Sequence, residues 1–136
     1  MINVKHQKYR KMKKAIATKN APGAIGPYSQ AIAANGMLFI SGQLPIDPAT
    51  GAFPEGGITE QTEQCMKNLQ AILTEAGCTF DNVVKSTCLL SDMANFGAMN
   101  AVYGKYFSGD CPARAAFAVK QLPKDALIEI EMIAAL

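Results

Sequence analysis

The sequence predicts an α+β protein built from one mixed β-sheet with two helices packed on one face. Three observations indicate this class. A hairpin signal lies near the N-terminus, two segments of helical periodicity lie in the middle, and apolar strand-like segments precede and follow each of them. Helices that connect strands in this order make crossover connections and cover a sheet.

The N-terminal part predicts three short strands. They are expected at residues 13–18, 30–35 and 37–41, and loops rich in Pro and Gly are expected at 20–27 and 44–57. Asn35-Gly36 separates the second and third of these strands. Asn-Gly between apolar runs is a strong hairpin signal, because both central residues of the turn need a positive φ.

The first helix is expected to begin after Thr59, which is a plausible N-cap, with Glu60 and Glu63 near its positive end. Apolar residues then recur at helical spacing, and Gly77 fits the position just after the last turn. The spaced residues are Cys65, Met66, Leu69, Ile72, Leu73 and Ala76.

A strand at 83–90 precedes a second amphipathic helix, and two strands at 113–119 and 127–134 finish the chain. The second helix carries an aromatic stripe and closes near Gly109. Such a stripe favours core packing or subunit contact over a cofactor site. Its members are Phe96, Met99, Tyr103, Tyr106 and Phe107.

Charge is unevenly distributed along the 136 residues. Six of the 13 basic residues and no acidic residue lie in the first 14 positions, so the rest holds seven basic and 11 acidic side chains, a net charge of about −4. We therefore expect a flexible basic extension at 1–11, with an organelle presequence as the alternative, and a single domain at 12–136. A negatively charged domain binds the phosphate backbone of nucleic acid poorly. No apolar stretch of the sequence is long enough to span a membrane.

The four cysteines form no CxxC pair and no zinc spacing, and the N-terminus has no secretory apolar segment. We expect reduced, buried thiols and a cytoplasmic protein, with a reactive thiol as the alternative. With one histidine, His6, the chain offers no two-His metal site. We expect no metal site, and the sequence has no dinucleotide-binding fingerprint.

Strand alternation places the residues that could carry chemistry. Arg114 shares a face with Ala116, and Glu129 shares a face with Glu131 on the last strand. Arg114 lies among small apolar residues and needs a partner: either one of these two glutamates or a ligand carboxylate. The glutamates are either site residues or solvated charges.

Tyr28, Ser41 and Gly42 admit two interpretations: they line a site, or they only fill a loop and end a hairpin strand. Together with Arg114 and Glu129, they could bind a small anion and position water. Such a set suits an intrinsically easy reaction better than a hard one.

Four segments resemble the Rid family, also called YjgF-like or L-PSP proteins, and most closely its RidA subgroup. They are NAPGAIGPYSQAI (20–32), FISGQLP (39–45), CPARAAFAV (111–119) and LPKDALIEIEMIA (122–134). The resemblance implies a chorismate-mutase-like fold and a homotrimer whose sheets close into a barrel, with sites between subunits. It also implies cofactor-free hydrolysis of 2-enamine and 2-imine acids, such as 2-aminoacrylate, to 2-keto acids and ammonia.

The resemblance assigns roles residue by residue. Arg114 matches the arginine that clamps the substrate carboxylate, and Glu129 matches the glutamate that orients the attacking water. Residues matching the pocket lining are Tyr28, Ser41, Gly42, Asn100 and, through its backbone N–H, Ala116. Many RidA proteins have Cys where this chain has Ala116, so thiol-based regulation at that position does not transfer.

Two other functions stay open. One is an endoribonuclease that inhibits translation, as described for some family members. The other is a non-catalytic trimer that binds small carboxylic acids. Negative charge in the domain disfavours the first, and only catalysis requires Glu129.

Overall fold

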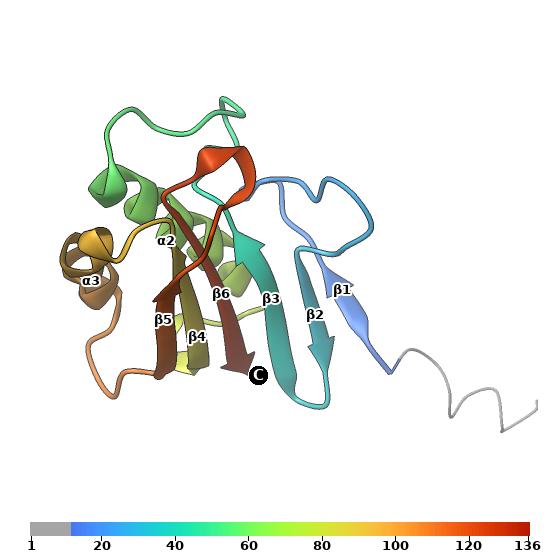
Figure 1. Cartoon of the computed structure of the whole chain (residues 1–136). Helices are drawn as coiled ribbons and strands as arrows, with labels where there is room; N and C mark the ends of the chain where they lie inside the picture. Colours follow the sequence, from blue (N-terminus) through green and yellow to red (C-terminus); the bar gives the residue numbers. More distant parts are fainter. Residues whose placement is uncertain (1–11) are drawn as a thin grey trace, which may run out of the picture.

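Six strands form one mixed sheet in the order β1-β2-β3-β6-β4-β5 in the computed structural model, which describes residues 12–136 (Figure 1). All neighbouring strands are antiparallel except β4 and β5, which are parallel. The extension expected at 1–11 lies outside the described residues. The strands are β1 (Lys14–Ile16), β2 (Ala31–Ala34), β3 (Met37–Gln43), β4 (Val83–Leu90), β5 (Ala113–Ala118) and β6 (Ile128–Ala135).

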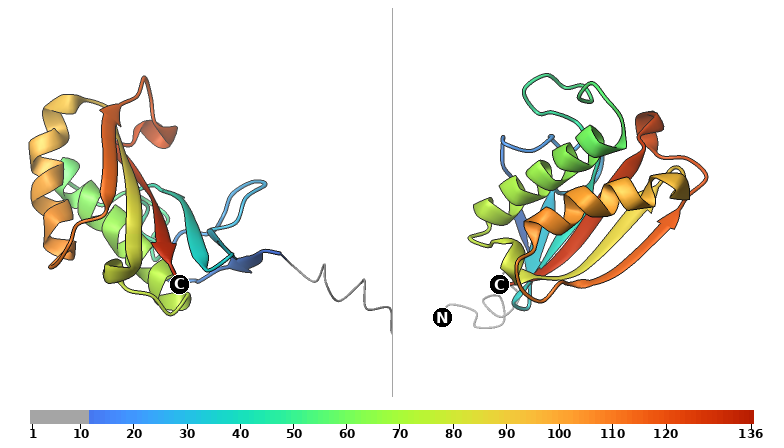
Figure 2. Two further views of the ribbon diagram at one scale, coloured as in Figure 1. Left: turned by 90° about the horizontal axis from the view of Figure 1, so that it is seen from below. Right: turned by 90° about the vertical axis from the view of Figure 1, so that its left-hand side faces the viewer.

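Two helices, α2 (Ile58–Glu75) and α3 (Phe96–Tyr103), lie side by side on the same face of the sheet (Figure 2). Among the described residues, four 3₁₀ turns join these elements: η1 (Phe80–Asn82), η2 (Met93–Asn95), η3 (Gly104–Tyr106) and η4 (Pro123–Asp125). This confirms the predicted α+β class and the placement of both helices on one face. Within residues 12–136, no helix combines the length and apolar character needed to cross a membrane.

The N-terminus of α2 differs from the prediction. Thr59 is not the N-cap: the cap residue is Gly57, and the Glu60 carboxylate accepts a hydrogen bond from the Gly57 N–H at 2.8 Å. This bond lowers the pKa of Glu60, because it stabilises the charged form. A glutamate three residues after the cap thus satisfies the N–H of the cap residue, as in one half of a capping box.

Three other turn predictions can be compared with the structure. Gly77 follows the C-cap of α2 with a φ of 77°, and the Cys78 N–H donates to the Leu73 carbonyl at 2.8 Å, as a Schellman motif requires. Asn35 and Gly36 both have positive φ, at 49° and 72°, which confirms the hairpin. The second helix is shorter than predicted, since α3 ends at Tyr103 and continues only as the 3₁₀ turn η3.

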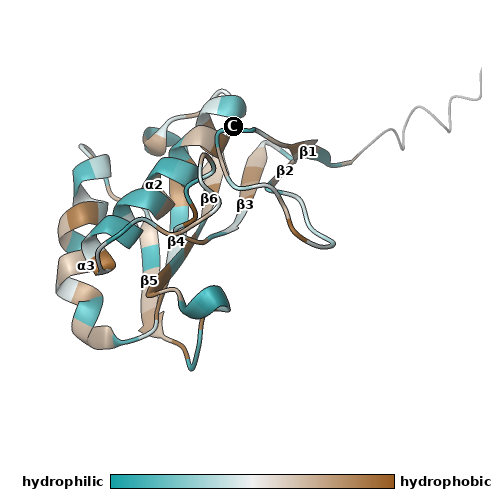
Figure 3. Ribbon diagram, turned by 90° about the horizontal axis from the view of Figure 1, so that it is seen from above, coloured by the Kyte–Doolittle hydropathy of each residue, from teal (hydrophilic) through white to brown (hydrophobic). Residues whose placement is uncertain are grey.

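The core lies between the helices and the sheet. Ile128, Ile130 and Met132 of β6 are at most 1% exposed and face α2 and α3. The hydropathy colours of α2 alternate along its length, as an amphipathic helix requires (Figure 3). The aromatic stripe joins this core, where Phe80 makes edge-on contacts with Tyr106 and Phe107.

The opposite face of the sheet, which we call the open face, carries several large apolar side chains and is not covered by any described element of a single chain. Ile32, Phe39 and Ile133 form a cross-strand row on β2, β3 and β6. Phe39 is 46% exposed, and Phe117 on β5 is 48% exposed. A monomer seldom leaves so many large apolar side chains in contact with water on one face.

Candidate active site

Two carboxylates project from the open face of β6. Glu129 and Glu131 alternate with the buried Ile128, Ile130 and Met132, so they point away from the helices. Across the ladder, Glu129 pairs with Leu89 of β4. The predicted face of both glutamates is confirmed.

A bulge in β3 lets Glu129 approach the backbone closely. The β3–β6 register shifts between Ile40 and Gln43, so Ser41 and Gly42 lie in the irregular stretch. A Cβ at Gly42 would lie 2.9 Å from Cδ of Glu129, which is closer than such contacts ever come. Gly42 is therefore needed to make room for the Glu129 carboxylate.

The surroundings of Glu129 favour its protonated form. Partial burial is the main cause that raises the pKa of this carboxyl, and the negative charge of Glu131 adds to it. A carboxylate with a raised pKa is a better proton acceptor than an ordinary surface glutamate. Such tuning is characteristic of general bases.

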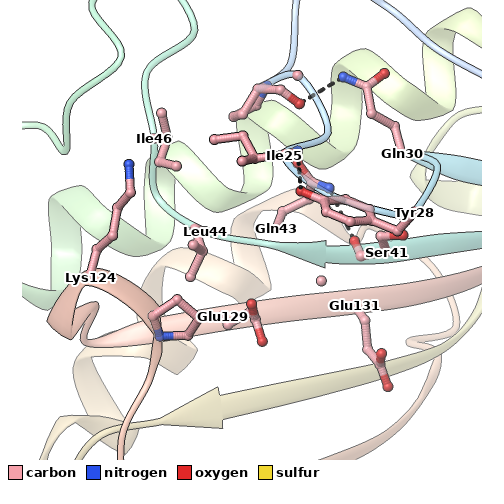
Figure 4. A pocket seen from close by; sticks show the side chains of 14 residues that line it. Ile25, Tyr28, Gln30, Ser41, Gln43, Leu44, Ile46, Lys124, Glu129 and Glu131 are labelled. Carbon is pink, nitrogen blue, oxygen red and sulfur yellow. Dashed lines mark hydrogen bonds between the residues drawn. The ribbon is translucent and has the colours of Figure 1, made fainter.

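Glu129 lines a cleft of about 580 Å³ together with Tyr28, Ser41, Gly42 and Glu131 (Figure 4). The rest of the wall holds both apolar and polar side chains: Pro22, Ile25, Leu44, Ile46 and Pro123, and Gln30, Gln43 and Lys124. Four of the seven predicted site residues, Tyr28, Ser41, Gly42 and Glu129, thus meet in one cleft. A concave site that combines apolar walls with convergent polar groups is typical of small-molecule binding.

The loop between β1 and β2 presents Tyr28 at the cleft. The Tyr28 hydroxyl accepts a hydrogen bond from the Ile25 N–H at 3.3 Å, and the ring is 51% exposed. Tyr28 therefore lies at the cleft and is also tied to its own loop. Ser41 donates its hydroxyl to the Ser29 carbonyl at 2.6 Å, which leaves its oxygen able to accept a bond from a ligand.

Gln30 holds this loop in place and was not singled out from the sequence. Its side chain is buried and bonds to both backbone groups of Thr18, at 2.7 Å and 3.0 Å. Its amide also donates to the carbonyls of Ala21 and Pro22, at 3.3 Å and 2.8 Å. A polar residue next to a Tyr-Ser pair in a glycine-rich loop was the only signal in the sequence.

Arg114 lies on the opposite side of the sheet from Glu129. On β5 it pairs with Ser86, which is fully buried and faces the helices. Its Nη1 donates to Oδ1 of Asn100 on α3 at 2.7 Å. Since Glu129 and Glu131 face the other way, the suggested ion pair between Arg114 and either glutamate is wrong for a single chain.

Two further predicted residues accompany Arg114 rather than Glu129. Asn100 contacts Arg114 directly, and Ala116 follows on the same face of β5, in register with the buried Cys88. The seven predicted site residues therefore fall into two groups on opposite faces of the sheet. Alternation along a strand predicted which residues share a face within β5 and within β6. It did not predict that Arg114 and Glu129 lie on opposite faces of the sheet.

The cysteines match the prediction in part. All four are free thiols; Cys65, Cys78 and Cys88 are buried, but Cys111 is exposed, contrary to expectation. Burial raises the pKa of Cys88 to about 11, so this thiol stays protonated and unreactive at neutral pH.

Comparison with known proteins gives one family. The profile of the family described as Endoribonuclease L-PSP matches residues 18–136. The 2-iminobutanoate/2-iminopropanoate deaminase of Mus musculus is 50% identical over 123 residues, which cover 90% of this chain and 91% of the mouse protein. The RutC family protein y4sK of Sinorhizobium fredii is 54% identical over 121 residues, covering 89% of this chain and 96% of y4sK.

Solved structures agree with the sequence comparison. The conserved Rid family protein YyfA from Yersinia pestis is 50% identical and superimposes with a TM-score of 0.89, covering 91% of this chain and 99% of YyfA. E. coli TdcF, solved with bound serine, is 38% identical with a TM-score of 0.87, covering 90% of this chain and 98% of TdcF. With these matches over nearly its whole length, the chain belongs to the L-PSP family of Rid (YjgF-like) proteins.

Proposed function

We propose that this protein hydrolyses 2-imino acids and their enamine tautomers, such as 2-aminoacrylate, to 2-keto acids and ammonia. The observation that carries the proposal is the Glu129 carboxylate, which faces a cleft beside Gly42 and has a raised pKa. The deaminase names of mammalian relatives at about 50% identity support it. The serine bound to TdcF also supports a small amino-acid-like ligand.

The chemistry requires a water and a proton acceptor. Ionised Glu129 accepts a proton from a water molecule while the water oxygen bonds to the electrophilic carbon of the protonated imine. Glu129 then returns the proton to the nitrogen of the resulting carbinolamine. The C–N bond breaks as the hydroxyl oxygen forms the keto group, and the hydroxyl proton leaves with ammonia as ammonium. Because the imine carbon is already electrophilic, orientation of water and substrate supplies much of the catalysis.

Arg114 binds the substrate carboxylate in this proposal. One chain holds Arg114 and Glu129 on opposite faces of its sheet, so a site that uses both needs two chains. We propose a homotrimer in which Arg114, Asn100 and Ala116 of one chain face Glu129 and Tyr28 of the next. Burial of the open face, with Phe39 and Phe117, would stabilise this assembly.

The alternatives make different demands on the residues. An endoribonuclease needs a base near the RNA 2′-hydroxyl, and the single histidine of the sequence, His6, lies outside the described residues. A binding protein for carboxylic acids needs Arg114 but not Glu129.

A cytoplasmic location belongs to the same proposal, since free thiols are typical of a reducing compartment.

The decisive experiment measures keto-acid and ammonia release when 2-aminoacrylate is generated in situ, with and without the protein. We expect Glu129→Gln to lower kcat by about 10²–10⁴-fold with little change in the binding of 2-oxobutanoate. Arg114→Ala should weaken that binding as well as turnover, because the carboxylate is present throughout the reaction.

Glu131→Gln is the matched comparison and should have a smaller effect than Glu129→Gln, since Glu131 lies two residues further along β6 and only Glu129 approaches Gly42. The deaminase proposal fails if folded wild-type protein does not accelerate release. It also fails if Glu129→Gln keeps wild-type turnover. Cleavage of RNA that survives Glu129→Gln would favour the endoribonuclease instead.

A further inference from the structure

Arg114 has an unusual setting for a side chain on an edge strand. It is exposed, and β5 is the last strand of the sheet, so no neighbouring strand covers it on one side. A free arginine in such a place samples many rotamers, and ordering it costs about 2 kcal/mol of side-chain entropy. Something must restrain this guanidinium if it is to present a fixed edge to a carboxylate.

Two aromatic rings of α3 provide that restraint. Cζ of Arg114 lies 5.0 Å from the ring centroid of Tyr103 and 5.5 Å from that of Phe96. Both distances fall within the range of cation–π contacts. Asn100, one turn from each ring on the same helix, accepts one N–H of the guanidinium and leaves its other donors available.

The Tyr103 ring is itself fixed from beneath. Its hydroxyl and Oγ of Ser86 form a hydrogen bond of 2.6 Å in the core, where Ser86 is fully buried and Tyr103 is 5% exposed. Phe107 packs against the same ring, with centroids 4.8 Å apart. Ser86 of β4 also lies in register with Arg114 of β5. The serine that fixes the Tyr103 ring and the arginine that the ring contacts therefore lie on neighbouring strands.

We propose that Tyr103 and Phe96 are positioning residues that hold the Arg114 guanidinium ready for a carboxylate, and that the Ser86–Tyr103 hydrogen bond keeps this aromatic cage rigid. The inference rests on the proposed function and extends it to residues that contact no substrate. It explains why a polar serine–tyrosine pair occupies the core directly beneath Arg114. Pre-ordering Arg114 lowers the entropy cost of substrate binding.

Side-chain NMR of the full-length protein tests the cage without relying on activity. The chain has two arginines, Arg10 and Arg114, so two Nε–Hε signals are expected, and Arg10→Lys identifies the signal of Arg114. We expect a rigid Nε of Arg114 in the wild type, judged by its heteronuclear NOE. Tyr103→Leu should make it mobile, because the ring is lost.

Graded variants separate the cage from folding effects. Tyr103→Phe keeps the ring but removes the bond to Ser86, and Ser86→Ala removes the same bond from the other side; both should give intermediate mobility. Tyr106→Phe is the matched control, because its hydroxyl bonds to Glu63 rather than to the cage, and should leave Arg114 rigid. These variants keep the test open if Tyr103→Leu does not fold.

Kinetics link the cage to the site. KM for 2-iminobutanoate should rise about 10-fold in Tyr103→Leu and a few-fold in Tyr103→Phe, with a smaller change in kcat. A rigid Arg114 in the ringless variant, a mobile Arg114 in the wild type, or an unchanged KM despite new mobility would each overturn the inference. If the wild type shows a rigid Arg114 but no hydrolysis, the deaminase proposal fails while the cage itself stands.

Discussion

Glu129 meets two opposing demands, because a useful base must be partly desolvated and desolvation of a charge costs stability. Burial, and then Glu131, raise its pKa, so the folded chain binds this proton more tightly than the unfolded chain does. The free energy of unfolding therefore falls as pH rises from the ordinary glutamate value of 4.5 through the raised folded value. Above that window the ionised carboxylate works against folding.

The first prediction follows from this sign. Glu129→Gln should raise Tm at pH 7, because a neutral amide of the same shape replaces a partly buried charge. The gain should disappear near pH 4, where wild-type Glu129 is itself protonated. Thermal unfolding at both pH values checks this. A lower Tm for Glu129→Gln than for the wild type at pH 7 would show that contacts of the carboxylate outweigh the cost of its desolvation.

The second prediction concerns pH and rate. Glu129 must be ionised to accept a proton, so activity should fall as pH drops through its raised pKa. Glu131→Gln removes one of the two causes of the raised value and should move this acid limb to lower pH. The kcat/KM profile of the free enzyme measures the limb. An unmoved limb would show that Glu131 does not act on the titrating group.

The third prediction concerns Gly42. Gly42→Ala would place a methyl group 2.9 Å from Cδ of Glu129 and must displace the carboxylate. We expect a loss of roughly 10–100-fold in kcat with the fold retained, because a shift of about 1 Å is enough to spoil a reacting geometry. Gly109→Ala, with open space around its Cβ, is the control and should keep full activity.

At the scale of elements, the loop between β1 and β2 depends on one buried side chain. Gln30 satisfies backbone groups of Thr18, Ala21 and Pro22, and the loop they belong to carries Tyr28. Gln30→Leu would leave these groups without partners, at a cost of about 1–3 kcal/mol for each that stays buried. The loop should therefore loosen before the sheet does.

Hydrogen exchange measures this fourth prediction. Amides of residues 19–28 should exchange faster in Gln30→Leu, and Tm should fall. Amides of β6 should still exchange only through global unfolding, as in the wild type. Gln70→Leu is the control, because Gln70 is exposed on α2. Unchanged exchange in the loop would mean that Gln30 is dispensable to it.

The elements show what the sequence could and could not predict. Helix and strand positions followed from periodicity and from Asn35-Gly36, because those signals are local. The N-cap at Thr59 was wrong because Glu60 can satisfy the Gly57 N–H without a hydroxyl at the cap. The separation of Arg114 from Glu129 depends on strand order and register, which no local pattern records.

At the scale of the molecule, the proposed catalytic groups of one chain lie on two opposite faces of its sheet. The helix-covered face holds Arg114 with Asn100, and the open face holds Glu129 with Tyr28 and its cleft. Phe39 and Phe117 are exposed on the open face, and burying them against another protein surface would be favourable. If the proposed trimer forms, each site combines the arginine of one chain with the glutamate of its neighbour.

The last prediction tests this division directly. Arg114→Ala chains keep Glu129, and Glu129→Gln chains keep Arg114, so neither variant forms an intact site alone. Any trimer that contains both kinds of chain has one interface where the intact arginine meets the intact glutamate. With random assembly, about three quarters of trimers are mixed and each has one intact site of three, so co-expression should restore about a quarter of wild-type activity.

Separate tags on the two chains allow mixed trimers to be isolated, where activity should reach about one third of wild type. Each variant purified alone, and the two mixed without exchange of subunits, are the controls and should stay inactive. Recovery requires that Arg114 and Glu129 act across a boundary between chains, because a site contained within one chain would carry a defect in every subunit. Absence of recovery in isolated mixed trimers would therefore refute the shared site, even if both variants are inactive alone.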